Sequence, residues 1–221
     1  MKGLFVTVEG PDGAGKTTQL KLLAQELEMA GIEVVLTREP GGTEIGDHIR
    51  SLILDPAFAK MADMTEILLY AASRAQHVNE LILPALDEGK VVLCDRFVDA
   101  SVAYQGYGLG FPVETIEQVN AHATGGLVPD RTYLFDLTVE DAKKRMHARG
   151  ALDRIEQRDD TFRQRVYDGF MAIAADEPAR VRRIDANREV EEIAEELRTD
   201  LLAFMKKRRD DDEDGNRDRS R

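Results

Sequence analysis

The stretch VEGPDGAGKTTQ, residues 8–19, decides the fold of this chain. Gly10, Gly15, Lys16 and Thr17 fit the spacing G-x-x-x-x-G-K-[ST] of a phosphate-binding loop. In such a loop the glycines let the backbone wrap around a phosphate, and the bare N–H groups at the start of the following helix attract the anion. The stretch therefore predicts a binding site for a nucleoside triphosphate.

The flanking residues support this prediction, because a phosphate-binding loop needs a strand before it and a helix after it. Residues 4–9 are apolar and β-branched, which is typical of a buried strand. Residues 16–29 carry leucines on one helical face, and Gly31 closes that helix. Lys16 is expected to reach the β- and γ-phosphates, and the Thr17 hydroxyl is expected to ligate Mg²⁺. The residues predicted to bind ATP are Gly10, Pro11, Asp12, Gly13, Ala14, Gly15, Lys16, Thr17 and Thr18.

Composition is that of an ordinary soluble protein, with 43% hydrophobic and 33% charged residues in a chain of 221. The formal net charge of −12 disfavours nucleic acid or an anionic membrane as a partner, so a phosphate site has to be a basic island on an acidic surface. The single cysteine, Cys94, excludes an internal disulfide and favours the cytoplasm. No apolar run is long enough for a membrane span, and the strand at 4–9 leaves no room for a signal peptide.

Strands alternate with helices along the rest of the chain. Further strands are predicted at 33–37, 91–95, 132–137 and, more weakly, at 180–186. This alternation predicts an α/β fold in which helices cover both faces of a parallel sheet. Helices are expected from about residue 43 and over about 64–86, 139–149, 162–175 and 190–207.

The chain is expected to form one domain, residues 1–207, followed by a charged tail. The tail, residues 208–221, contains no apolar side chain and is predicted to be disordered, because it cannot bury enough surface to fold.

Three arginines could hold a second anion beside the nucleotide. Arg38 and Arg96 directly follow the second and third predicted strands, and ligands of doubly wound sheets gather at the carboxyl ends of strands. A guanidinium offers a bidentate fork to a phosphate. Arg74 follows Tyr70 by four residues, so a helix would place both on one face, where the ring could stack on a nucleobase. Each arginine alone could equally be an ion pair or a packing partner.

Two classes of phosphate-loop protein are disfavoured because the sequence lacks their motifs. It contains neither the N-K-x-D motif of a GTPase nor an L-S-G-G-Q-like signature of an ABC ATPase. The arginine pair and the Tyr70–Arg74 spacing favour a small kinase over a nucleotide-gated switch, because a switch has no use for an acceptor site. Transfer to a phosphate acceptor, already anionic at neutral pH, requires alignment and charge neutralisation more than a base, so no histidine is expected to be catalytic.

Five blocks appear in order along the chain and resemble bacterial thymidylate kinases: VEGPDGAGKTT, TREPGGT, YAASR, DRFVDASVAYQG and RGALDRIE. The resemblance covers about residues 3–205, and the second and fourth blocks are more specific than the phosphate loop. It implies a phosphate-loop kinase fold with a five-stranded parallel sheet, assembled as a homodimer. The implied reaction is ATP-dependent phosphorylation of dTMP to dTDP with Mg²⁺, part of dTTP biosynthesis. Another nucleotide kinase of this fold, acting on dUMP or an analogue, is the alternative, and a nucleotide-gated switch is a further one.

The resemblance also implies roles for single residues. Asp12, a carboxylate inside an anion cradle, would point toward the acceptor and accept a hydrogen bond from the dTMP 3′-hydroxyl. Arg38 and Arg96 would bind the dTMP phosphate, and Asp95 would organise the Mg²⁺ ion together with Thr17. The residues implied to bind dTMP are Asp12, Arg38, Tyr70, Arg74, Arg96, Ser101, Tyr104 and Gln105.

A mobile lid is implied at about residues 149–160. The variable residues of the phosphate loop hold no basic side chain, so an arginine of RGALDRIE would have to supply positive charge at the transferred phosphoryl group. Arg154 is the first candidate and Arg149 the second. The predicted catalytic residues are Lys16, Arg96, Arg154, Arg149 and Asp12.

Overall fold

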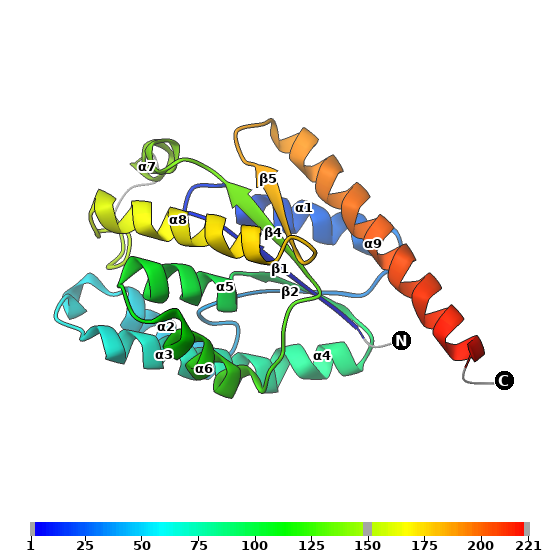
Figure 1. The fold of residues 1–221 in the computed structure, drawn as a ribbon, viewed down its shortest axis with the longest axis horizontal. Helices are drawn as coiled ribbons and strands as arrows, with labels where there is room; N and C mark the ends of the chain where they lie inside the picture. Colours follow the sequence, from blue (N-terminus) through cyan, green and yellow to red (C-terminus); the bar gives the residue numbers. More distant parts are fainter. Residues whose placement is uncertain (1–2, 148–151, 219–221) are drawn as a thin grey trace.

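A computed structural model describes residues 3–147 and 152–218 of the chain (Figure 1). Within these residues, five parallel strands form one sheet in the order β2-β3-β1-β4-β5. The parallel α/β sheet predicted from the sequence is confirmed, and each strand lies within one residue of its expected ends. The strands are β1 Leu4–Glu9, β2 Val34–Arg38, β3 Val91–Asp95, β4 Arg131–Asp136 and β5 Val181–Asp185.

Helices connect the strands and cover both faces of the sheet (Figure 1). The α-helices are α1 Lys16–Met29, α2 Glu44–Leu54, α3 Asp63–His77, α4 Leu83–Asp87, α5 Val98–Ser101, α6 Val113–Thr124, α7 Val139–His147, α8 Asp160–Asp176 and α9 Val190–Asp218. A short 3₁₀ helix, η1, spans Pro56–Phe58, and two π-helical segments, η2 and η3, span Val78–Ile82 and Val102–Gly108. The helix expected over 64–86 is therefore α3, η2 and α4 in continuous sequence. None of the helices in the described part of the chain is long and apolar enough to cross a membrane.

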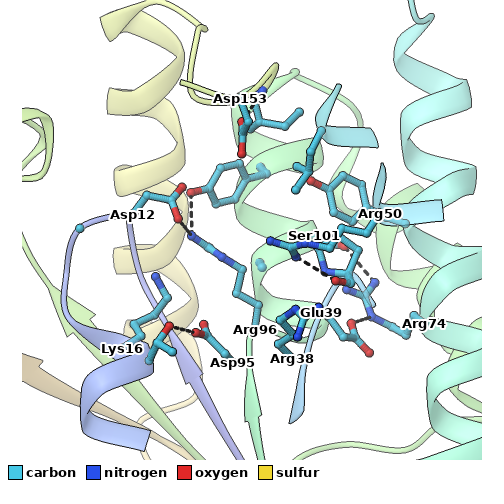
Figure 2. A pocket seen from close by; sticks show the side chains of 18 of the residues that line it. Asp12, Lys16, Arg38, Glu39, Arg50, Arg74, Asp95, Arg96, Ser101 and Asp153 are labelled. Atoms are coloured by element: carbon cyan, nitrogen blue, oxygen red, sulfur yellow. Dashed lines mark hydrogen bonds and ion pairs between the residues drawn. The ribbon is translucent and has the colours of Figure 1, made fainter. Parts of the chain in front are cut away.

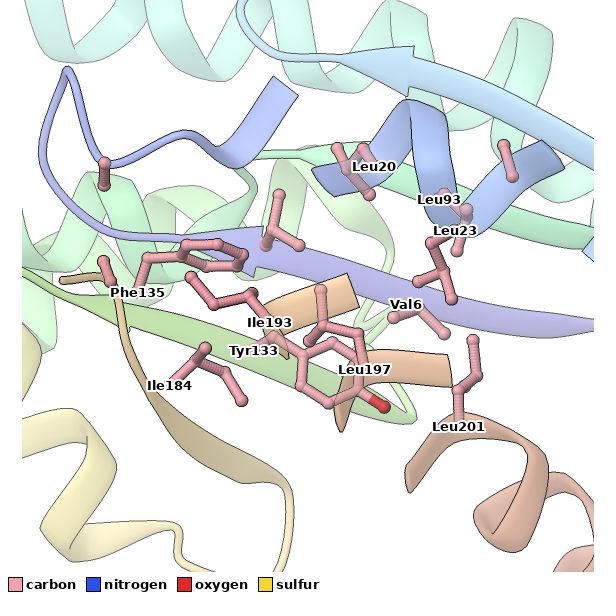
Figure 3. Packing of buried hydrophobic residues seen from close by; sticks show 14 of the residues in the cluster. Val6, Leu20, Leu23, Leu93, Tyr133, Phe135, Ile184, Ile193, Leu197 and Leu201 are labelled. Atoms are coloured by element: carbon pink, nitrogen blue, oxygen red, sulfur yellow. The ribbon is translucent and has the colours of Figure 1, made fainter. Parts of the chain in front are cut away.

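Side chains of alternate strand residues build the two halves of the core, because successive side chains of a strand point to opposite faces. Val6 of β1 and Tyr133 of β4 pack with leucines of α1 and α9 on one face (Figure 3). Phe5 of β1 and Val92 of β3 pack with η2 and α4 on the other face. Burial on both faces explains the mostly apolar sequences of β1, β3 and β4.

The sheet register brings the chemistry-bearing ends of three strands together. Asp95, the last residue of β3, pairs with Val8 of β1 and with Arg38, the last residue of β2. The loops that follow these strands begin at Gly10, Glu39 and Arg96. They therefore meet at the carboxyl edge of the sheet, where a doubly wound fold binds its ligands.

The C-terminal helix differs from the expectation of a disordered tail after Lys207. In the structure α9 continues to Asp218. Residues 208–218 contain two arginines followed by five acidic residues and no proline, the residue that would break a helix. Arg208 forms an ion pair with Asp130 at 3.0 Å, which ties the start of this extension to the loop before β4.

Candidate active site

A cleft of about 400 Å³ opens at the carboxyl ends of β1, β2 and β3. The eight residues predicted to bind dTMP all line it, together with six residues of the predicted ATP and metal sites. Those six are Gly13, Gly15, Lys16, Thr17, Thr18 and Asp95. The cleft therefore joins the phosphate loop to the predicted acceptor site.

Backbone geometry explains two of the loop glycines. Gly10 has a φ of 129°, and a Cβ there would lie 2.5 Å from the carbonyl oxygen of Phe135. Gly15 has a φ of 88° at the N-terminus of α1, where a left-handed backbone turns the chain into the helix. The loop can adopt its anion-binding shape only with glycine at these positions.

The Lys16 ammonium lies folded over the loop. Its Nζ donates hydrogen bonds to the carbonyl oxygens of Gly10, at 3.1 Å, and Pro11, at 2.8 Å. Burial, followed by the nearby Arg96 guanidinium, lowers the pKa of Lys16 to about 8. A phosphate anion at the loop would restore the preference for the charged ammonium.

The oxygen atoms of Thr17 and Asp95 fit a Mg²⁺ site. The Thr17 hydroxyl donates a hydrogen bond to Asp95 Oδ2 at 2.7 Å. Mg²⁺ prefers hard oxygen donors and commonly uses one or two protein oxygens together with water and substrate phosphates. A hydroxyl and a carboxylate side by side at the mouth of a phosphate loop form such a donor set.

Arg96 and Asp12 meet across the cleft. Arg96 Nη2 donates to Asp12 Oδ1 at 3.0 Å and to the Tyr104 hydroxyl at 3.3 Å (Figure 2). The Asp12 carboxylate thus points toward Arg96 and away from Lys16 (Figure 2). Burial of Arg96 opposes its charge, but Tyr104, Asp12 and the neighbouring Asp95 together raise the pKa of the guanidinium well above its ordinary value.

Arg74 lies at the far end of the cleft, with only 2% of its surface exposed. It donates to Glu39 Oε2 at 2.7 Å and to Ser101 Oγ at 2.9 Å (Figure 2). It also donates to the carbonyl oxygen of Phe97 at 2.9 Å. A further short contact joins it to Asn120. These bonds occupy four of the five N–H groups of a guanidinium and hold it rigidly against the cleft.

The family model for thymidylate kinase matches residues 8–197. The chain belongs to the thymidylate kinase family. A thymidylate kinase of Exiguobacterium sibiricum is 67% identical over 208 residues, which cover 94% of this chain and 98% of that protein. One from Pelotomaculum thermopropionicum is 51% identical over 214 residues, 93% of this chain and 98% of the other.

A solved structure agrees with this membership. The crystal structure of thymidylate kinase from Ehrlichia chaffeensis superposes with a TM-score of 0.74 at 34% identity, covering 91% of this chain and 100% of that one. The predicted family and fold are confirmed, and the chain is a phosphotransferase that phosphorylates dTMP with ATP for dTTP synthesis. Nothing in the comparisons favours the dUMP kinase or the switch protein.

One predicted catalytic residue of this thymidylate kinase does not face the cleft. Arg154 is 8% exposed, and its guanidinium donates to the Ile53 carbonyl oxygen at 2.6 Å and to Glu66 Oε2 at 2.8 Å. A buried carboxylate on α3 holds the guanidinium in this arrangement, and contact of Arg154 with the transferred phosphoryl group stays a prediction. The second candidate, Arg149, lies outside the described residues.

Sequence reasoning missed Arg50, which lines the cleft, and Glu9, a buried residue behind it. Arg50 lines the cleft and donates to the Pro40 carbonyl oxygen at 2.9 Å, and burial together with Arg38 lowers its pKa. It shares a face of α2 with the buried Ile53, so a cation on the apolar stripe of that helix was the available signal. Arg38 itself is half-exposed and bonded to Asp47 at 3.1 Å.

Glu9 is the other missed residue. It is buried at the end of β1, and its Oε1 accepts a hydrogen bond from the Phe97 backbone N–H at 2.7 Å. Burial, followed by the nearby Asp99 carboxylate, raises the pKa of Glu9 to about 8. A charged residue at the end of an otherwise apolar strand was the sequence signal for this position.

Proposed function

We propose that the cleft holds both substrates of this thymidylate kinase, with the ATP phosphates on residues 10–18 and the dTMP phosphate beside Arg96. One observation carries this assignment. Arg96 Nη1 is buried and has no hydrogen-bond acceptor among the described residues, although the nitrogen beside it bonds Asp12 and Tyr104. An oxygen of the dTMP phosphate would satisfy it, with Arg38 and Arg50 as the other cations of the cleft.

In this arrangement the reaction is an in-line displacement. An oxygen of the dTMP phosphate attacks the γ-phosphorus of ATP, a new O–P bond forms, and the bond to the β–γ bridging oxygen breaks to release ADP. Lys16 would move from the carbonyl oxygens of the loop to the β- and γ-phosphates. The acceptor is already ionised, so the residues act by alignment and charge neutralisation.

Thr17 and Asp95 would hold Mg²⁺, which supplies charge neutralisation on the triphosphate when bound. Asp12 lies between the two substrate positions and would accept a hydrogen bond from the 3′-hydroxyl of dTMP. Tyr70 and Gln105 line the acceptor end of the cleft, where Tyr70 would stack on thymine. Arg74 has one N–H group left for a thymine carbonyl oxygen.

We also propose that the protein acts as a homodimer in the cytoplasm. The neighbouring helices α2 and α3 expose apolar side chains, among them Leu52, Met64 and Leu68, and a second copy would cover them. A cytoplasmic location suits the nucleotide substrates and the lone buried thiol of Cys94.

The test is release of ADP from ATP with Mg²⁺ in the presence of dTMP, dUMP, dCMP, dGMP or no acceptor. We expect rapid release only with dTMP, and slower release with dUMP, since burial of the 5-methyl group contributes about 1 kcal/mol. Equal release without any monophosphate would contradict the acceptor assignment. Arg96→Lys should raise the KM for dTMP and leave the KM for ATP near its wild-type value.

A further inference from the structure

The Glu66 carboxylate lies outside the cleft lining and binds side chains from two other parts of the chain. It lies on α3 with 1% of its surface exposed. Its Oε2 accepts hydrogen bonds from Arg154 Nη2 at 2.8 Å and from Arg158 Nη2 at 2.7 Å. Its Oε1 accepts one from Gln105 Nε2 at 3.2 Å. A carboxylate buried this deeply is stable only when paired, so Glu66 firmly joins α3 to η3 and to the segment that carries both arginines.

Arg154 anchors that segment at a second place. Its Nε donates to the Ile53 carbonyl oxygen at 2.6 Å, and its backbone N–H donates to the Leu54 carbonyl oxygen at 3.0 Å. The two neighbours of Arg154, Asp153 and Ile155, line the cleft. The buried guanidinium therefore fixes the position of two residues of the cleft wall.

The same segment is held internally. Asp153 Oδ1 accepts hydrogen bonds from the backbone N–H groups of Ile155 and Glu156, both at 2.8 Å. Glu156 Oε2 accepts one in return from the Asp153 N–H at 3.0 Å, the reciprocal pattern of a capping box. Arg158 lies over the Phe162 ring at 4.7 Å. The segment thus behaves as one rigid turn whose placement depends on its contact with Glu66.

Five residues of the cleft lining lie within one contact or one helical turn of Glu66 or of its partner Arg154. Asp153, one of them, is labelled in Figure 2. Gln105 bonds Glu66 directly, and Tyr70 follows Glu66 by one helical turn on α3. Leu54, Asp153 and Ile155 connect to it through Arg154. The hydrogen bonds that Glu66 accepts in the described part of the chain come from Gln105, Arg154 and Arg158. A change at Glu66 would therefore reach the acceptor side of the cleft first.

We propose that Glu66 is a positioning residue for the acceptor: by holding Arg154, Arg158 and Gln105, it sets the cleft wall against which dTMP binds. Arg154 and Arg158 then act through this wall and do not contact the transferred phosphoryl group in the arrangement described. Removal of the Glu66 charge should weaken the use of dTMP selectively and leave the ATP site intact.

The test compares Glu66→Gln with a matched control, Asp200→Asn. Asp200 is also a carboxylate between two arginines, Arg131 and Arg182, but it lies on α9 and does not line the cleft. Both substitutions should lower the Tm, since each weakens a charged hydrogen-bond network. Only Glu66→Gln should raise the KM for dTMP, by about tenfold, with the KM for ATP within about twofold of wild type, because a KM change without a kcat change reports lost binding.

Two further measurements keep the proposal testable if Glu66→Gln folds poorly. Arg158→Gln, at a partly exposed position, should raise the KM for dTMP in the same direction by a smaller factor. Hydrogen exchange of residues 152–158 should accelerate in the Glu66 and Arg158 variants and stay at the wild-type rate in Asp200→Asn. Equal KM ratios for dTMP and ATP in the Glu66 and Asp200 variants, or unchanged exchange of 152–158, would overturn the proposal.

Discussion

The backbone of Arg96 is held in an unusual conformation by hydrogen bonds with its neighbours. Among residues 3–147 and 152–218 Arg96 is the one non-glycine residue with a positive φ, 72°, a conformation that costs about 1 kcal/mol or more. The Arg96 N–H donates to the Val8 carbonyl oxygen at 2.9 Å, and the Cys94 thiol donates to the Arg96 carbonyl oxygen at 3.0 Å. The next N–H, of Phe97, donates to Glu9. These bonds hold the strained turn that directs the guanidinium into the cleft.

Glu9 should make stability depend on pH. Its folded-state pKa of about 8 lies above the ordinary value of 4.5, so the folded protein retains a proton that the unfolded chain loses between these values. The free energy of unfolding should therefore fall as pH rises from about 4.5 to 8. Asp99, Arg96 and Lys16 are the charged groups around the carboxyl.

Glu9→Gln is neutral at every pH and should remove this contribution. Urea unfolding of both proteins at pH 5, 6, 7 and 8 measures it: the wild type should lose stability relative to the variant as pH rises. A difference between the two proteins that is the same at pH 5 and pH 8 would contradict the buried, protonated carboxyl.

Asp12 gives a second prediction at this scale. Asp12→Asn removes the charge that pairs with Arg96 and keeps a side chain of the same size. We expect the KM for dTMP to rise by about tenfold, the effect of losing one charge-assisted hydrogen bond, while ATP binding changes little. Binding of a fluorescent ATP analogue measures the effect on the ATP site, and steady-state kinetics measure the effect on the KM for dTMP. A selective loss of ATP binding would refute the assignment of Asp12 to the acceptor.

At the scale of elements, the sequence predicted those helices, strands and turns that depend on interactions between residues close together in the chain. The strands, the phosphate loop and α1 follow from apolar runs and glycine positions, and they appear where expected. The π-helical segments η2 and η3 were not predicted, because nothing in local periodicity separates them from an α-helix. The ion pair between Arg154 and Glu66 could not be predicted, because the two residues lie 88 positions apart in the sequence. A single sequence does not predict which side chains from distant elements will contact one another.

Helix α2 offers a test of how an element positions site residues. Thr43 caps it, with Oγ1 accepting a hydrogen bond from the Gly46 N–H at 3.0 Å, and α2 carries Arg50 into the cleft. Thr43→Ala should lower the free energy of unfolding by about 1 kcal/mol and raise the KM for dTMP, while Thr43→Ser should retain both. Urea unfolding and kinetics of the pair check this, and equal values for the two variants would show that the cap does not matter.

At the scale of the whole molecule, this acidic protein places several cations together at the carboxyl edge of the sheet. The net charge is −12, yet Lys16, Arg38, Arg50 and Arg96 line the same cleft. Their mutual repulsion is part of the reason that the pKa values of Lys16 and Arg50 are lowered. Binding of two phosphorylated substrates relieves this repulsion, so substrates should stabilise the fold as well as react in it.

The two faces of α3 connect the cleft to the proposed dimer. Glu66, Tyr70 and Arg74 lie on the inner face, while Met64 and Leu68 are exposed, Leu68 to 53%. A second copy packed on this outer face would support the helix that carries the acceptor residues. Leu68→Glu places a charge in that interface and should convert the dimer to a monomer, because an unpaired buried charge is costly at an interface.

Light scattering coupled to size exclusion measures the mass of this variant. Val128→Glu is the matched control, since Val128 is 61% exposed and lies on the loop between α6 and β4, on neither α2 nor α3. This variant should leave the mass unchanged. If the dimer contact supports α3, the monomeric Leu68→Glu variant should also have a higher KM for dTMP than the Val128→Glu control. Its KM for ATP should change less. A wild-type protein that elutes as a monomer, or a Leu68→Glu variant that remains dimeric, would exclude this face as the interface.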